Sequence, residues 1–122
     1  MNAPCTVNET DGVTVVEFTR DTHLDAVATE AVQTEVFGLV ESDRAPRILL
    51  YMENVSFISS LGLGFLLALR VKAARKGSEL ALSGLRPALF DLFKVTQLDQ
   101  LYTFYPARAD AITQLRTKTP SA

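Results

Sequence analysis

Two adjacent hydroxyl side chains, Ser59 and Ser60, stand in front of a glycine-interleaved apolar segment in FISSLGLGFLL. Gly62 and Gly64 leave the backbone bare there, and the first turn of a helix carries unpaired N–H groups and a partial positive charge. Such a place favours an oxyanion, or a phosphate attached to one of the hydroxyls. Serine is also among the best N-cap residues, so helix capping is the simpler explanation of the pair.

The motifs for nucleotide binding and catalysis are incomplete. Gly62-Leu63-Gly64 is only a G-x-G, because Leu67 stands where a dinucleotide fingerprint needs its third glycine, and no G-x-x-x-x-G-K-S/T occurs. A Ser60–His23–Asp25 triad can be written down, but it lacks the G-x-S-x-G elbow of hydrolases. With a single histidine and a single cysteine, no zinc site can be assembled. We therefore expect no enzyme, no cofactor and no metal.

The length of the chain indicates a single domain, residues 1–122. Its net charge is −2, and charges of both signs are scattered along the sequence. The sequence contains no cluster of basic residues that would indicate nucleic-acid binding. The longest apolar run, Phe65 to Leu69, is too short to insert into a membrane, and the start MNAPC is not a signal peptide. Cys5 has no partner for a disulfide, so we expect a cytoplasmic protein with a spare thiol near a mobile terminus.

The serine and glycine residues of the motif must be positioned by helices and strands, which the first half of the chain begins to supply. VTVVEF, residues 13–18, follows the turn signal Asp11-Gly12 and predicts a strand, with residues 6–9 as its hairpin partner. Asp25 is placed to cap a helix in AVATEAVQTEVFGLVE. RILLYM, residues 47–52, reads as a strand that is covered on both faces.

The second half alternates helices with strands. The segment 57–77 predicts a helix that ends at Gly77. A buried strand in ELALS, a helix that starts at Pro87, a short strand within 98–104 and a helix over 107–117 follow. The order β-β-α-β-α-β-α-β-α predicts an α/β fold with about four helices on a mixed, mainly parallel sheet of four to five strands.

The stretch VSFISSLGLGFLL resembles the signature V-x-F-I-D-S-S-G-L-G of STAS domains, in the anti-sigma factor antagonist branch. The downstream segment GSELALSGLRPALFDLFKVTQLDQLYTF is similar to the rest of that domain, and the resemblance extends over about residues 7–116. It implies a STAS-like fold and a non-enzymatic module that binds an anti-sigma factor, often a serine protein kinase, and so frees a sigma factor. The implied partner-binding residues are Asp25, Ser59, Ser60, Leu61, Gly62, Leu63 and Phe65.

This sequence departs from the family pattern where phosphorylation normally occurs. Ser59 stands at the motif aspartate, Ser60 at the first serine, and Leu61 at the usual phosphoacceptor. Tyr51 likewise stands where many relatives carry an aspartate, which we expect to alter the polar surroundings of the site. We expect Leu61 to face outward at the start of the helix.

Several alternatives follow from this departure. Ser60, or its neighbour Ser59, is phosphorylated in place of residue 61; or the domain binds its partner constitutively; or it is a subunit of another assembly, stressosome-like or transport-associated. A small-molecule or nucleotide binder that uses the same helix terminus is a further class. A homodimer is compatible with all of them.

Overall fold

A computed structural model describes residues 4–117 of the chain. Its elements, in chain order, are β1 (Cys5–Thr10), β2 (Val13–Phe18), β3 (Thr22–Leu24), α1 (Ala26–Glu41), β4 (Arg47–Tyr51), β5 (Val55–Ile58), α2 (Ser60–Lys76), β6 (Glu79–Ser83), α3 (Pro87–Val95), the 3-10 helix η1 (Leu98–Gln100), β7 (Thr103–Tyr105) and α4 (Arg108–Arg116). The first and last few residues of the expected single domain lie outside the described range.

The main sheet has five strands in the order β1-β2-β4-β6-β7, and only the β1–β2 pair is antiparallel. Asp11 and Gly12 make the β1–β2 turn with φ of 52° and 81°, the left-handed backbone that a two-residue hairpin loop requires. The mixed, mainly parallel sheet of an α/β fold is therefore confirmed, and so is its hairpin.

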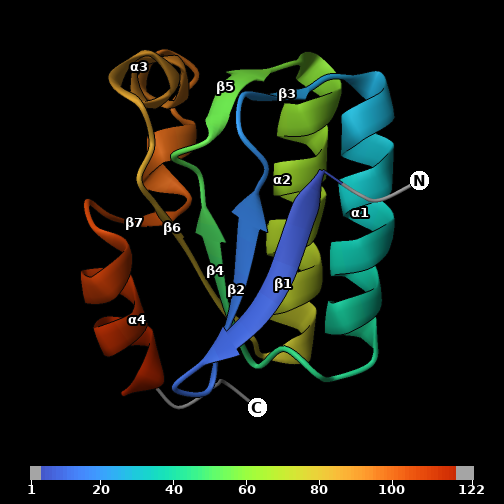
Figure 1. Ribbon diagram of the computed structural model, residues 1–122, viewed down its shortest axis with the longest axis vertical. Helices are drawn as coiled ribbons and strands as arrows, with labels where there is room; N and C mark the ends of the chain where they lie inside the picture. The colour runs from blue at the N-terminus through green and yellow to red at the C-terminus, as the bar shows by residue number, and fades with distance from the viewer. Residues whose placement is uncertain (1–3, 118–122) are drawn as a thin grey trace.

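Helices cover both faces of this sheet (Figure 1). α1 and α2 lie side by side on one face, α4 lies on the other, and α3 sits beside the upper ends of the strands. The central strand β4 shows the consequence, because Ile48 and Leu50 belong to the cluster under α1 and α2 while Leu49 belongs to the cluster under α4. The expected two-sided burial of β4 is confirmed.

Two short strands were missed by the sequence analysis. β3 and β5 form a separate parallel pair, in which His23 lies opposite Phe57 and Leu24 opposite Ile58. The expected helix over 57–77 therefore begins only at Ser60, because the two residues before Ser59 are committed to β5. The last strand is also shorter than expected, since residues 98–100 form η1.

The expectation of a mobile terminus at Cys5 is wrong. Cys5 is the first residue of β1, pairs with Phe18 and is buried in the main core cluster. Burial, with a smaller contribution from the negative charge of Glu35, raises the pKa of the Cys5 thiol to about 11. Its sulfur therefore behaves as a small apolar group.

Within the described residues, no helix is both long and apolar enough to cross a bilayer.

Candidate functional site

The N-terminus of α2 is organised by the side chain of Ser59. Its Oγ donates a hydrogen bond to the carbonyl oxygen of Leu24 (2.7 Å) and accepts one from the Gly62 N–H (3.2 Å). The Ser59 N–H also donates to the Leu24 carbonyl (3.0 Å). Ser59 is thus the N-cap of α2 and at the same time ties α2 to the end of β3.

We expect Ser59→Ala to lower the free energy of unfolding by about 1–2 kcal/mol, because it removes a cap and leaves the Gly62 N–H without its acceptor. Ser60→Ala is the matched control. The Ser60 side chain is exposed, so its loss is expected to change stability by less than about 0.5 kcal/mol. Urea unfolding followed by circular dichroism measures both, and equal effects would contradict the assignment of the cap to Ser59.

Gly62, the first glycine of the motif, is packed in the interior of the protein. Gly62 is buried, and a Cβ built on it would lie 2.8 Å from Ile58 Cγ2 and 2.9 Å from the Leu24 carbonyl oxygen. The expectation that Gly62 admits another molecule is therefore wrong, because the close approach is made by β3 and β5. Phe65 is buried as well, and Leu63 is half-buried against the core, so the expected surface position of Phe65 is also wrong.

Ser60 and Leu61 do face the solvent. Leu61 is 59% exposed, as expected for the first turn of a helix at the sheet edge. Among the hydrogen bonds of residues 4–117, none engages the N–H of Ser60 or of Leu61, so two amides of the positive helix end are open to solvent. Asp25 caps α1 in the same way, accepting from the Ala28 N–H at 3.0 Å, and its carboxylate is exposed.

Two further exposed apolar side chains lie at this end of the molecule. Val27 is in the first turn of α1, and Phe57 is in β5, where its ring lies 6.0 Å from that of His23. β3, β5 and the starts of α1 and α2 meet here (Figure 1). We name Val27, Phe57 and Leu61 the apolar cap. The exposure of Val27 and Phe57 could not be predicted from the sequence, because hydrophobicity alone does not show whether a side chain faces inward or outward.

A hollow of about 260 Å³ lies next to Leu61, between α1 and α2. Its other lining residues are Ala26, Thr29, Glu30 and Gln33 of α1. The Thr29 hydroxyl is buried and has no hydrogen-bond partner in the described part of the chain. Leu61 of the apolar cap thus borders a cleft that also carries one carboxylate, that of Glu30.

Tyr51 belongs to the opposite face of the sheet. It packs with the cluster under α4, and the guanidinium of Arg108 lies 5.0 Å from the centre of its ring. Its hydroxyl donates a hydrogen bond to Glu53, which is the main reason that the pKa of Tyr51 is raised. The expectation that Tyr51 alters the polar surroundings of the motif is wrong, because the sheet separates them.

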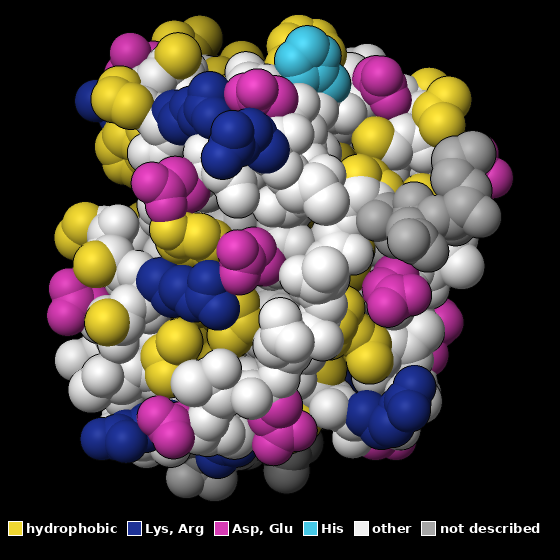
Figure 2. Space-filling view, viewed as in Figure 1, with side chains coloured by type: hydrophobic (Ala, Val, Ile, Leu, Met, Phe, Trp, Pro, Cys, Tyr) yellow, Lys and Arg dark blue, Asp and Glu magenta, His cyan; other side chains and the backbone are white. Residues whose placement is uncertain are grey.

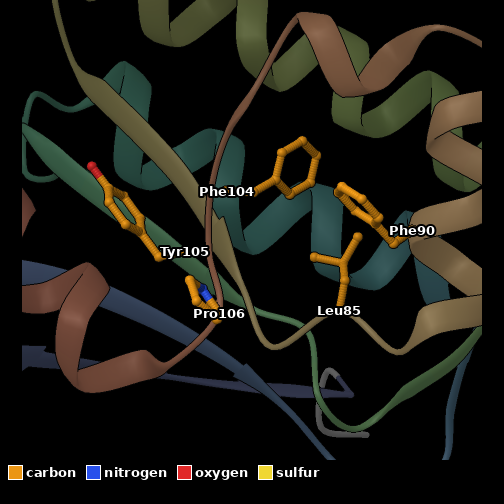
Figure 3. A pocket seen from close by; sticks show the side chains of 5 residues that line it. All are labelled: Leu85, Phe90, Phe104, Tyr105 and Pro106. Carbon is orange, nitrogen blue, oxygen red and sulfur yellow. The ribbon is translucent and has the colours of Figure 1, made fainter.

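Another hollow, of about 330 Å³, lies between α3 and the connection from β7 to α4, away from the start of α2. Figure 3 shows the rings of Phe90 and Phe104 next to each other above Leu85, with Pro106 at one side and Tyr105 pointing away, and the two rings pack edge to face. None of these five lining residues is charged, so this hollow lacks the Arg or Lys side chain that often pairs with a nucleotide phosphate.

The face of the molecule in Figure 2 carries Lys and Arg side chains interspersed with Asp and Glu. Ion pairs such as Arg108 with Glu17, at 2.6 Å, join charges of opposite sign in the described part of the chain. This face therefore has no single-sign patch of the kind that attracts nucleic acid.

The fold and the site together define a small α/β domain whose candidate site is an apolar surface around the start of one helix. The STAS domain family matches residues 5–111, and the chain belongs to that family. The resemblance first seen in VSFISSLGLGFLL is confirmed.

Individual relatives carry related names. An "Anti-sigma F factor antagonist" from Paenibacillus polymyxa is 24% identical over 115 residues, which is 94% of this chain and 97% of that protein. The crystal structure of an anti-sigma factor antagonist from Mycobacterium paratuberculosis is similar with a TM-score of 0.80 and 28% identity, over 95% of this chain and 99% of that one. An anti-sigma-factor antagonist (STAS) domain protein from Planctomyces limnophilus shares the fold, with a TM-score of 0.83 and 19% identity over 94% and 99% of the two chains.

Proposed function

We propose that this chain is an anti-sigma factor antagonist, which binds an anti-sigma factor of the serine-kinase type and so regulates transcription that depends on a sigma factor. The names of its relatives support this role. The observation that carries the proposal is the exposure of Leu61 beside two open amides, at the position where the family motif has its phosphoacceptor. The protein works by binding and does not catalyse a reaction.

The contact surface in this proposal is the apolar cap, with Ser60 and Asp25 at its edge. Large apolar side chains that become buried at the centre of an interface supply most of its binding energy. Open N–H groups beside them give the partner's oxygens a fixed direction of approach. The neighbouring cleft offers the Glu30 carboxylate as a polar contact at the rim.

We further propose that binding is constitutive. Residue 61 has no hydroxyl, and the hydroxyl of Ser59 is engaged on both sides by Leu24 and Gly62. The hydroxyl of Ser56 is buried. Ser60 is exposed, and it lies on a different side of α2 from residue 61 because successive helical residues are rotated by roughly 100°. A kinase that modifies residue 61 of the motif would therefore meet Ser60 in the wrong orientation.

The test is calorimetric titration of a serine-kinase-type anti-sigma factor from the same organism with the wild type and with Leu61→Asp. A buried charge in place of a buried leucine is expected to weaken binding about 100-fold, or about 2.7 kcal/mol. Val95→Asp is the matched control, because Val95 is 83% exposed at the end of α3. Unchanged affinity of Leu61→Asp would overturn the proposed surface.

A further inference from the structure

The outward side of α2 carries an apolar stripe that the proposed function does not use. Gly64, Leu67, Val71 and Arg75 are spaced three or four residues apart and so lie along one side of the helix, and all four are exposed. We name them the outer stripe. The opposite side of α2 is the buried one and consists of Gly62, Phe65, Leu66, Leu69 and Ala73.

The glycine in this stripe has no role within the fold. A Cβ built on Gly64 meets nothing within 4 Å, and its backbone does not have the positive φ that favours glycine. A helical glycine is nevertheless less stable than alanine at the same position. The stripe thus has a gap at Gly64 and a projecting side chain at Val71, which is 44% exposed.

Two charges near the ends of the stripe lack ion-pair partners among residues 4–117. Arg75 lies near the C-terminal end of α2, and Glu30 lies beside Leu61 at the other end, where both line the same hollow. By contrast, Lys72 and Lys76 of α2 are paired with Glu41 and Asp43 at 2.8 and 3.2 Å. The unpaired side-chain charges near the two ends of this face are therefore of opposite sign.

We propose that the outer stripe is a self-association surface that binds the outer stripe of a second copy of this chain. In an antiparallel pair with its two-fold axis between Leu67 and Ala68, Gly64 and Val71 are equally far from the axis. Val71 of each copy therefore fills the gap over Gly64 of the other. The same axis brings Arg75 of each copy opposite the start of α2 in the other, within reach of Glu30.

Self-complementarity in shape and in charge is what a closed, isologous dimer requires. One helix face is small compared with the interfaces of stable complexes, so the dimer is weak and depends on concentration. This inference does not rest on the proposed function, because its central contacts are Gly64, Leu67 and Val71 and not the apolar cap.

Sedimentation equilibrium over roughly 5 to 500 μM, a range suited to weak association, tests the proposal. The wild type is expected to shift from monomer to dimer. Val71→Asp is expected to weaken the dimer at least tenfold, whereas Val95→Asp, an equally polar change on α3, leaves it unchanged. Gly64→Ala is expected to raise the melting temperature of the monomer and yet to weaken the dimer, a pair of opposite effects that a purely structural glycine would not give.

A charge reversal tests the orientation. Arg75→Glu and Glu30→Arg are each expected to weaken association several-fold, and the double variant is expected to regain most of the lost affinity. A wild type that remains monomeric over the whole range would overturn the proposal. So would a dimer that is insensitive to Val71→Asp, or a double variant that is no better than the single ones.

Discussion

Gly62→Ala is expected to lower the free energy of unfolding by about 2–3 kcal/mol, which is a large effect for a single methyl group. The added Cβ would lie 2.8 Å from Ile58 Cγ2 and 2.9 Å from the Leu24 carbonyl oxygen. That carbonyl cannot move freely, because it accepts hydrogen bonds from both the N–H and the hydroxyl of Ser59. Relief of the clash must therefore separate α2 from β3 or break the cap. The measurement is urea unfolding followed by circular dichroism, which reports stability directly.

Gly64→Ala is the matched control for this prediction, since it makes the same change two residues further along the same helix. Nothing lies within 4 Å of the new methyl group, and alanine is the better helix former. We expect Gly64→Ala to raise the free energy of unfolding by up to about 1 kcal/mol when the protein is monomeric. If both variants lose the same stability, the two glycines have the same role and the tight contact with β3 is not the cause.

The regular parts of the fold could be predicted because their signals are local. The Asp11-Gly12 turn between two β-rich segments and the continuous apolar run of β4 both report a backbone state within a few residues. β3 and β5 could not be predicted in this way. Each has at most four residues, and they pair with each other across a long stretch of chain with a register shift between Thr22 and His23. Such a pairing leaves no periodic pattern in either segment.

The local structure of the candidate site could be predicted only in part. The helix N-cap residues Asp25 and Ser59 could be predicted, because helix capping is specific to a few residue types. The two glycines were given one role, whereas only the packing of Leu24 and Ile58 distinguishes Gly62 from Gly64. Phe57 was missed, since its exposure depends on the unforeseen pairing of β5 with β3. Features that depend on residue type alone, such as helix N-caps, could therefore be predicted, whereas contacts between distant segments of the chain could not.

If binding is constitutive as proposed, Leu61→Ser is expected to create a phosphorylation switch. The substitution restores a hydroxyl at the outward position of the first turn of α2, while the cap at Ser59 stays intact. Incubation with the kinase-type anti-sigma factor and ATP, followed by mass spectrometry, is expected to show phosphate on residue 61 of the variant. We expect the wild type to be modified at least about tenfold more slowly, because Ser60 is rotated by roughly 100° from that direction.

Phosphorylation of the variant is then expected to weaken its binding to the anti-sigma factor about 100-fold. The phosphate adds nearly two negative charges where Leu61 otherwise provides an apolar contact, so the partner would have to bury a strongly hydrated group. Adding Ser60→Ala to Leu61→Ser controls for the neighbouring hydroxyl, and the double variant should be phosphorylated as fast as the single one. Rapid modification of the wild type at Ser60 would instead show that the switch has moved by one residue, and constitutive binding would be refuted.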